Sequence, residues 1–156
     1  MSKEVYMLTG IALIGTGIYI AIRKASASVP ENLVSTVTSL DSLYKQFGAL
    51  NNIDPKLIKA IAIVESNENP NAIGDDGKSF GLMQVSEVVG ASYGLNKEDL
   101  MIPTFNIQAG SGFLAQMIKK YGLEGGIQAY NLGETKFLEG FSSPTYLTNV
   151  LKYYRG

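Results

Sequence analysis

Apolar residues recur at three- and four-residue steps along most of the chain, which is the pattern of amphipathic helices. The predicted helices cover residues 34–48, 54–66, 86–93, 104–121, 123–130 and 143–154. Asp54-Pro55 and Ser143-Pro144 mark two helix starts, because each pairs an N-cap acceptor with a proline at the first helical position. Residues 67–78 are dense in Asn, Asp, Gly and Pro, which favours turns. The pattern therefore predicts a mainly α domain.

The start of the chain has a different pattern. Residues 5–22 carry no charge, and Arg23 and Lys24 follow them directly. At about 1.5 Å per residue, a helix over this run spans about 27 Å, close to the thickness of a bilayer core. We therefore predict one N-terminal transmembrane helix. The predicted organisation is a membrane anchor over residues 1–24, a linker over residues 25–32 and a helical domain over residues 33–156.

A cleaved signal peptide is the competing interpretation of the apolar run, because Ala25-Ser26-Ala27 resembles a cleavage site. Arg23 and Lys24 lie between the run and that site, whereas signal peptides carry their basic residues ahead of the run. An uncleaved anchor is therefore favoured, and a buried core helix ranks third. The charges do not fix the topology, since these two residues favour a cytoplasmic downstream flank while a lysine and the amino group upstream offset that bias.

Composition narrows the chemistry. The chain has no histidine and no cysteine, which excludes thiol nucleophiles, Ser-His relays, disulfides and the usual zinc sites. Thirteen basic and fourteen acidic residues give a net charge of −1, so no basic excess favours nucleic acid as a partner. Proton chemistry falls mainly to carboxylates, and we expect no metal and no cofactor.

One carboxylate shares a face with apolar residues. Ile58, Ile61, Ala62 and Glu65 are spaced i, i+3, i+4 and i+7 within the predicted helix 54–66. Partial burial and the negative end of the helix dipole would both raise the pKa of Glu65, which suits a general acid. The competing interpretation is a helix-terminal carboxylate that faces solvent or pairs with a lysine such as Lys59.

Four short motifs lie in the predicted domain. They are Glu-Ser at 65–66, Asn-Pro-Asn-Ala at 69–72, Gly-Leu-Met-Gln at 81–84 and Ala-Tyr-Asn-Leu-Gly at 129–133. In this order, the motifs resemble the lytic transglycosylase domain of the soluble lytic transglycosylase type. This domain is related to goose-type lysozyme. The resemblance extends from about residue 34 to residue 154 and implies a lysozyme-like helical fold.

The resemblance also implies roles for individual residues. The Glu of the Glu-Ser pair is the sole catalytic acid and base in that family, which assigns the role to Glu65. The substrate-binding residues that it implies are Met83 and Gln84 in the sugar groove, Tyr130 and Asn131 on its other side, and Tyr146. Tyr146 is included because a tyrosine of the final helix commonly approaches the catalytic Glu in such domains. Each has an ordinary alternative, since amides beside glycine turns often bond the local backbone, and Tyr and Met often fill a core.

The glycine-rich loop departs from many family members, which have a serine where this chain has Gly74. Residues 74–81 instead resemble a subgroup with the pattern Gly-Asp-x-Gly-x-Ser-x-Gly. In that pattern Ser79 supplies a hydrogen bond to the N-acetyl group of a sugar, although Ser79 equally suits a turn cap. We interpret Asp75 and Asp76, the nearest candidates for a second carboxylate, as turn residues.

The reaction implied by the resemblance cleaves peptidoglycan between N-acetylmuramic acid and N-acetylglucosamine. The muramyl C6 hydroxyl attacks C1 and leaves a 1,6-anhydro end, so Glu65 acts first as acid and then as base. Water in place of that hydroxyl would make the protein a lysozyme, and a non-catalytic wall-binding or assembly protein is the third reading. We expect a single-pass membrane protein whose domain faces peptidoglycan, at the cell inner membrane or in a phage virion, or in a secretion or conjugation apparatus.

Overall fold

The structure is a computed structural model that describes residues 39–156. The helices are α3 (Leu40–Asn51), α4 (Pro55–Ser66), α5 (Glu87–Ser92), α6 (Lys97–Leu100), α7 (Pro103–Leu132), α8 (Glu134–Leu138) and α9 (Pro144–Arg155). The predicted anchor and linker lie outside the described residues. Within residues 39–156, no helix is both long and apolar enough to cross a bilayer. The prediction of a mainly α domain is confirmed for this part of the chain.

The first two helices begin at polar caps. The Ser39 hydroxyl accepts a hydrogen bond from a backbone N–H in the first turn of α3, and the Asp54 carboxylate does the same for α4. Pro55 occupies the first position of α4, where its missing N–H leaves no hydrogen bond unmade. The predicted start of α4 is therefore confirmed. The part of the first predicted helix that precedes residue 39 lies outside the described residues.

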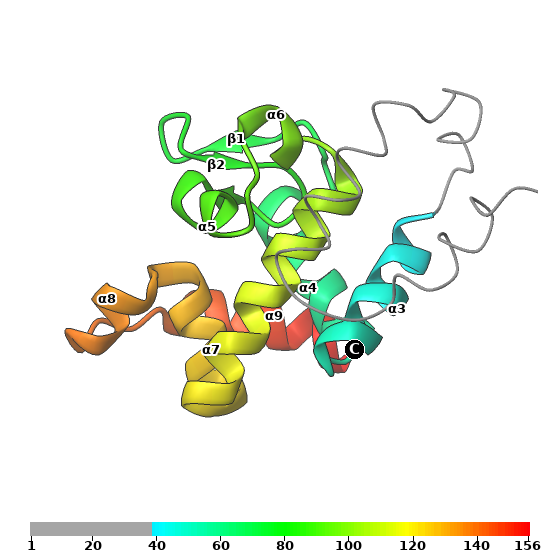
Figure 1. The fold of residues 1–156 in the computed structure, drawn as a ribbon. Helices are drawn as coiled ribbons and strands as arrows, with labels where there is room; N and C mark the ends of the chain where they lie inside the picture. Colours follow the sequence, from blue (N-terminus) through cyan, green and yellow to red (C-terminus); the bar gives the residue numbers. More distant parts are fainter. Residues whose placement is uncertain (1–38) are drawn as a thin grey trace, which may run out of the picture. The chain divides into compact units, whose positions relative to one another are not determined.

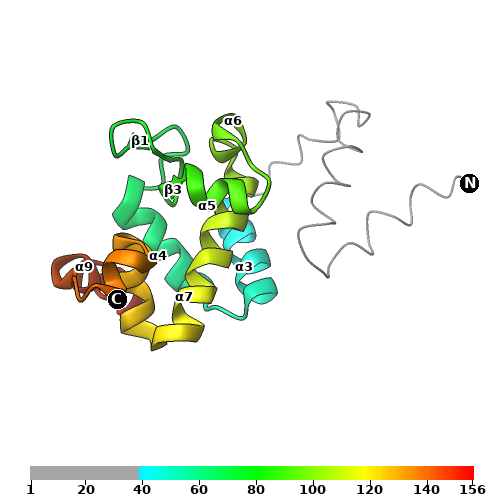
Figure 2. The ribbon, with the colours of Figure 1, turned by 60° about the vertical axis from the view of Figure 1, so that its left-hand side comes forward.

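Helix α7 is the long central element of Figure 1, with α5 and α6 near its amino-terminal end and α8 beyond its carboxyl-terminal end. Gly122 interrupts it with φ 72° and ψ 178°, a left-handed φ that glycine adopts without steric cost. The prediction of two separate helices that meet near residue 122 is therefore confirmed. In Figure 2, α3 lies beside α4 and beside α7, and α9 packs against both α4 and α7.

Helix α9 begins at Pro144 as predicted, but the expected N-cap at Ser143 is wrong. The Ser143 side chain makes no capping bond, and its buried hydroxyl has no partner among the described residues. Its backbone N–H instead donates to Oε1 of Gln128 at 3.1 Å. Residue 143 has φ −129° and ψ 65°, outside the extended geometry usual for a cap.

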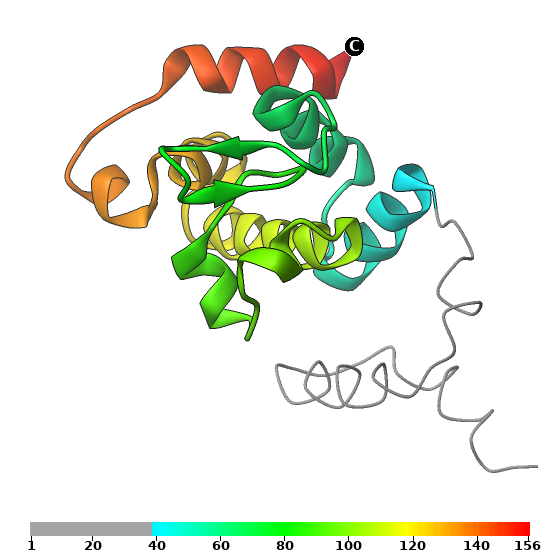
Figure 3. The ribbon, with the colours of Figure 1, turned by 90° about the horizontal axis from the view of Figure 1, so that it is seen from above.

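Three short strands were not predicted. They are β1 (Ile73–Gly74), β2 (Ser79–Phe80) and β3 (Val85–Ser86), which form an antiparallel sheet in the order β1-β2-β3. Each strand has two residues, too few for an alternating pattern to appear in the sequence. In Figure 3, seen from above, the strands lie between α9 on one side and α5 and α6 on the other.

The core lies between α4 and α7, which are joined by α3 and α9, since each of these two helices packs against both. Its fully buried side chains include Tyr44, Ile58, Ile61, Leu82, Met83, Leu100, Ile107, Leu114, Met117, Ile127 and Val150. Ile58 and Ile61 place the same face of α4 inward that carries Glu65, as the spacing predicted. Burial of the first turns of α4 therefore directs its last turn toward the interior, and the site is built there.

Candidate active site

Glu65 lies in the last turn of α4 and is partly buried. The hydroxyl of Tyr146, from the first turn of α9, donates a hydrogen bond of 2.6 Å to its Oε1. The competing interpretation, a carboxylate paired with Lys59, is wrong, since Lys59 pairs with Asp41 at 2.9 Å. The acid and its partner lie 81 residues apart in the sequence and are brought together by the packing of α9 on α4.

The environment of Glu65 favours its protonated form. Burial raises the pKa of this carboxyl from 4.5 to about 7, against the opposing effect of the Tyr146 hydrogen bond. The negative charge of Asp75 raises it further. Burial, followed by the charge of Glu65, also holds the pKa of Tyr146 well above 10, so this hydroxyl remains a donor. Near neutral pH, Glu65 can therefore both release and accept a proton.

Glu65 faces a cleft of about 470 Å³. Three groups of residues form its walls: the end of α4, the β-hairpin region with α5, and both halves of α7. The lining residues are Glu65, Asp75, Ser79, Gln84, Val85, Ser86, Val89, Phe113, Tyr130, Asn131, Leu132 and Gly133. The cleft therefore brings together Glu65, Ser79, Gln84, Tyr130 and Asn131 of the predicted set.

Gln84 lies on the cleft but holds the backbone with its amide. Its Nε2 donates to the carbonyl oxygens of Gly81 at 2.9 Å and of Ala72 at 3.2 Å. Both amide hydrogens are thereby used, which leaves only the amide oxygen for a ligand. The residue itself has φ 46°, a left-handed value that is uncommon outside glycine. Gln84 therefore stabilises the loop around the cleft, as expected of an amide that bonds the backbone beside a glycine turn.

Met83 does not line the cleft. Its side chain is fully buried, and its sulfur lies where a side chain at Gly110 would otherwise sit. The groove-lining position predicted from the motif is therefore corrected, because α7 offers this long apolar side chain a gap in the core. The main chain of Met83 still matters to the site, since its carbonyl oxygen accepts a hydrogen bond of 2.7 Å from the Tyr130 hydroxyl.

Tyr130 and Asn131 close the α7 side of the cleft. Tyr130 is buried, and its ring packs against Phe113 with centroids 5.6 Å apart. Burial, together with the charge of Glu65, raises the pKa of Tyr130 far above 10. Asn131 is exposed at the end of α7 and presents a side-chain amide at the cleft. A flat aromatic wall with an amide at its edge suits an acetylated sugar.

Ser79 is buried on β2 and donates its hydroxyl hydrogen to Oδ2 of Asp75 at 2.7 Å. This bond leaves the lone pairs of the Ser79 oxygen as acceptors for an N–H group in the cleft. Asp75 and Asp76 have φ 48° and 53° in the turn between β1 and β2, which agrees with their interpretation as turn residues. Asp75, however, also lines the cleft.

We expect Asp75→Asn to lower the pKa of Glu65 by less than about one pH unit, because it removes a negative charge that disfavours ionisation of Glu65. Asn also tolerates the left-handed backbone of this turn. A carbon-13 NMR titration of the Glu65 carboxyl measures the effect. Asp76→Asn is the matched control and should leave that pKa unchanged. Equal titration curves for wild type and Asp75→Asn would contradict the assignment.

The sequence left several site residues unidentified. The sequence predicts Asp75 only as a turn residue, because no sequence pattern shows that the hairpin folds back over the end of α4. Phe113 lies on α7, 17 residues before Tyr130, and only the interruption at Gly122 brings both rings to one cleft. The described residues contain no group of three acidic side chains placed to hold a metal ion.

The fold and site define a class: a helical domain in which one partly buried carboxylic acid faces a polar cleft, an arrangement suited to acid-catalysed glycosidic cleavage. The chain belongs to the transglycosylase SLT domain family, whose model matches residues 42–145. The resemblance inferred from the four motifs is thereby confirmed.

The chain is also similar to individual proteins, one of which is named a transglycosylase. The chain is 36% identical over 115 residues to an X polypeptide of Escherichia coli, and the match covers 67% of each chain. A second Escherichia coli X polypeptide is 40% identical over 94 residues, covering 54% of each chain. The chain is also 31% identical over 103 residues to the transglycosylase of enterobacteria phage PRD1, which covers 65% of this chain and 37% of the phage protein.

Proposed function

We propose that the protein is a lytic transglycosylase that cleaves the glycan strands of peptidoglycan between N-acetylmuramic acid and N-acetylglucosamine. The observation that carries the proposal is Glu65, a carboxyl with a pKa of about 7 at the wall of a cleft. A glycosidic oxygen leaves readily only when it is protonated, and a carboxyl that is neutral near pH 7 supplies that proton. Membership of the SLT domain family supports the same chemistry.

Two proton transfers complete the reaction. Glu65 first donates its proton to the glycosidic oxygen as the bond from that oxygen to C1 breaks, and the Tyr146 hydroxyl stabilises the carboxylate that forms. The muramyl C6 hydroxyl then bonds to C1, and its proton passes to Glu65, which restores the acid. The products are a 1,6-anhydro-muramyl end and a free hydroxyl on the leaving sugar, with no water consumed.

The predicted substrate-binding residues have different roles in the proposed reaction. In this proposal Asn131 and the oxygen of Ser79 bind the acetamido and hydroxyl groups of the sugars, while Tyr130 supplies an apolar wall. Gln84 contributes its amide oxygen and the shape of the loop. Tyr146 acts on Glu65 rather than on the sugar.

Digestion of purified peptidoglycan, followed by mass analysis of the fragments, tests the proposal. We expect muropeptides with 1,6-anhydro ends, which are lighter by one water than reducing ends. Intact peptidoglycan after prolonged digestion would contradict any cleavage and would favour the non-catalytic wall-binding protein considered above.

A lysozyme-type hydrolase is the second candidate, because Asp75 places another carboxylate on the same cleft. Glycosidases that activate water need a second carboxylate beside the acid. Hydrolysis would give reducing ends, and Asp75→Asn would then abolish cleavage. For the transglycosylase, which needs no water, we expect Asp75→Asn to retain cleavage and to shift only its pH dependence.

We further propose that residues 5–22 anchor the protein in a membrane, with the catalytic domain facing peptidoglycan. The cellular inner membrane and a phage virion membrane both fit, as does a secretion or conjugation apparatus that opens the wall locally. The similarity to the phage PRD1 transglycosylase supports the phage setting. Protease treatment of intact virions or spheroplasts tests the arrangement. Protection of residues 39–156 on the cytoplasmic side of a cellular membrane would contradict it.

A further inference from the structure

The chain makes a strained turn directly after the Glu-Ser pair. Asn67 and Glu68 follow α4 with φ 54° and 59°, so two successive residues with side chains adopt the left-handed region. Each such residue costs about 1 kcal/mol or more relative to ordinary backbone, and glycine would avoid that cost. The turn is therefore maintained by contacts with the rest of the fold.

The backbone of the turn is bonded to α4 itself. The Asn67 N–H donates to the carbonyl oxygen of Ile63 at 2.9 Å. The Glu68 N–H donates to the carbonyl oxygen of Ala62 at 3.2 Å, and the two bonds close the end of the helix. Ser66 adds a link outward, since its hydroxyl lies 2.7 Å from the Leu82 carbonyl oxygen beside the cleft. These contacts hold the cleft side of the turn.

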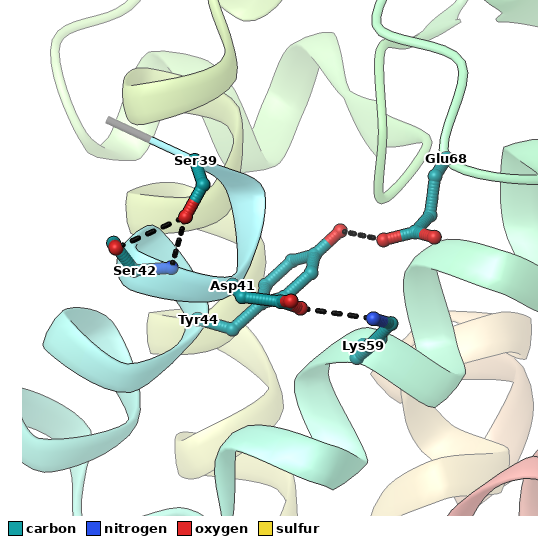
Figure 4. A network of polar contacts seen from close by, with 6 residues as sticks. All are labelled: Ser39, Asp41, Ser42, Tyr44, Lys59 and Glu68. Carbon is teal, nitrogen blue, oxygen red and sulfur yellow. Dashed lines mark hydrogen bonds and ion pairs between the residues drawn. The ribbon is translucent and has the colours of Figure 1, made fainter. Parts of the chain in front are cut away.

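The opposite side of the turn is held by α3, as Figure 4 shows. The Tyr44 hydroxyl donates to Oε1 of Glu68 at 3.0 Å, and the Tyr44 ring is 2% exposed. Burial raises the pKa of Tyr44 far above its usual 10, so the hydroxyl remains a donor to the carboxylate. Asp41 of α3 also forms an ion pair with Lys59 of α4. This pair is largely exposed and contributes little to stability.

We propose that Tyr44 and Glu68 are positioning residues for Glu65, which hold the last turn of α4 so that the carboxyl stays at the cleft and within reach of Tyr146. The turn is held at Ser66 on the cleft side and at Glu68 on the α3 side, which follow Glu65 by one and three residues. A small displacement of a catalytic group lowers the rate of the chemical step more than it weakens substrate binding. This inference rests on the function proposed for Glu65.

Two variants test the inference. Tyr44→Phe removes the hydroxyl but keeps the buried ring, and Glu68→Gly removes the carboxylate while relieving the strained backbone. We expect each to lower kcat about three- to tenfold with KM unchanged. In Glu68→Gly, relief of the strained backbone opposes the loss of the acceptor of the buried Tyr44 hydroxyl, so we expect little change in Tm, which separates positioning from stability. Glu68→Gln retains the accepting oxygen and should restore most of the rate.

Tyr154→Phe is the matched control, because Tyr154 also donates to a carboxylate beside an end of α4, that of the N-cap Asp54 at the opposite end of the helix. We expect it to leave kcat unchanged. Unchanged kcat in both Tyr44→Phe and Glu68→Gly would overturn the inference, as would equal losses in the Tyr154 control.

Amide hydrogen exchange provides a reading that needs no substrate. Faster exchange at the Asn67 and Glu68 N–H groups in Tyr44→Phe supports the inference, and unchanged exchange overturns it. A wild-type protein that cleaves no glycan would contradict the proposed function instead. The exchange rates then decide by themselves whether Tyr44 holds the turn.

Discussion

Glu65→Gln should lower the rate of glycan cleavage by at least about a thousandfold, while the fold and glycan binding remain. The amide has nearly the shape of the carboxyl and still accepts the Tyr146 hydrogen bond, but it cannot donate a proton to a glycosidic oxygen. A general acid typically contributes a factor of about 10² to 10⁴, and Glu65 serves in both steps of the proposed reaction. Release of soluble muropeptides, set against binding to insoluble peptidoglycan, measures both quantities.

The same substitution should stabilise the domain at alkaline pH. The folded-state pKa of about 7 exceeds the ordinary 4.5, so ionising Glu65 costs folding free energy on the order of 3 kcal/mol at about 1.4 kcal/mol per pH unit. That cost is absent below about pH 4.5, grows as the pH rises toward 7, and is fully present above 7. In urea unfolding at pH 5 and pH 8, the stability gained by Glu65→Gln over wild type should therefore be much larger at pH 8.

Glu124→Gln is the control for both measurements, because this glutamate is exposed on α7 with only a long ion pair to Arg155 at 3.8 Å. It should change neither cleavage nor the dependence of stability on pH. A Glu65→Gln variant that still cleaves peptidoglycan would sink the catalytic role. Equal stability gains at pH 5 and pH 8 would show that the raised pKa is not the cause.

Asn106→Ala should destabilise the domain by about 4 kcal/mol, a large part of the 5–15 kcal/mol typical of a folded domain. Asn106 is fully buried and makes three hydrogen bonds. Its oxygen accepts from the Met83 N–H at 2.8 Å, and its nitrogen donates to the carbonyls of Phe80 and Leu100 at 2.7 Å each. Truncation removes all three hydrogen bonds from a fully buried site, and urea unfolding measures the loss.

Asn106→Asp refines this prediction without a change in shape. One carboxyl oxygen still accepts from Met83, whereas the other faces two carbonyl oxygens and can donate to only one of them, and then only when protonated. Burial raises the pKa of such a group, so the variant should be most stable at low pH and lose stability as the pH rises. Asn51→Ala, which removes one hydrogen bond to Ser111, is the control and should cost about 1 kcal/mol at every pH.

Local sequence signals predicted the parts of the fold that short-range physics decides. Asp54-Pro55 located the start of α4, and the spacing from Ile58 to Glu65 placed the carboxylate on an inward face. Gly122 separated the two halves of α7. The motifs around Gln84 and Asn131 identified two sides of one cleft. Each of these features depends on neighbours in the sequence or on a family resemblance.

What the sequence could not supply depends on contacts between distant segments. Met83 is directed inward by the gap at Gly110, and the Gln84 amide is used by carbonyls on its own loop. Asp75 reaches the cleft because a sheet of two-residue strands folds over the end of α4. The Ser143 side chain lacks its expected capping bond, and the backbone N–H of this residue donates to the Gln128 side chain instead.

The use of α9 to supply Tyr146 has a consequence for synthesis of the protein. The acid on α4 leaves the ribosome well before the helix that provides its hydrogen-bond partner. A nascent chain, or one that terminates before Pro144, lacks both Tyr146 and the packing of α9 on α4. The hydrogen bond to Glu65 is therefore among the last contacts of the site to become available during synthesis.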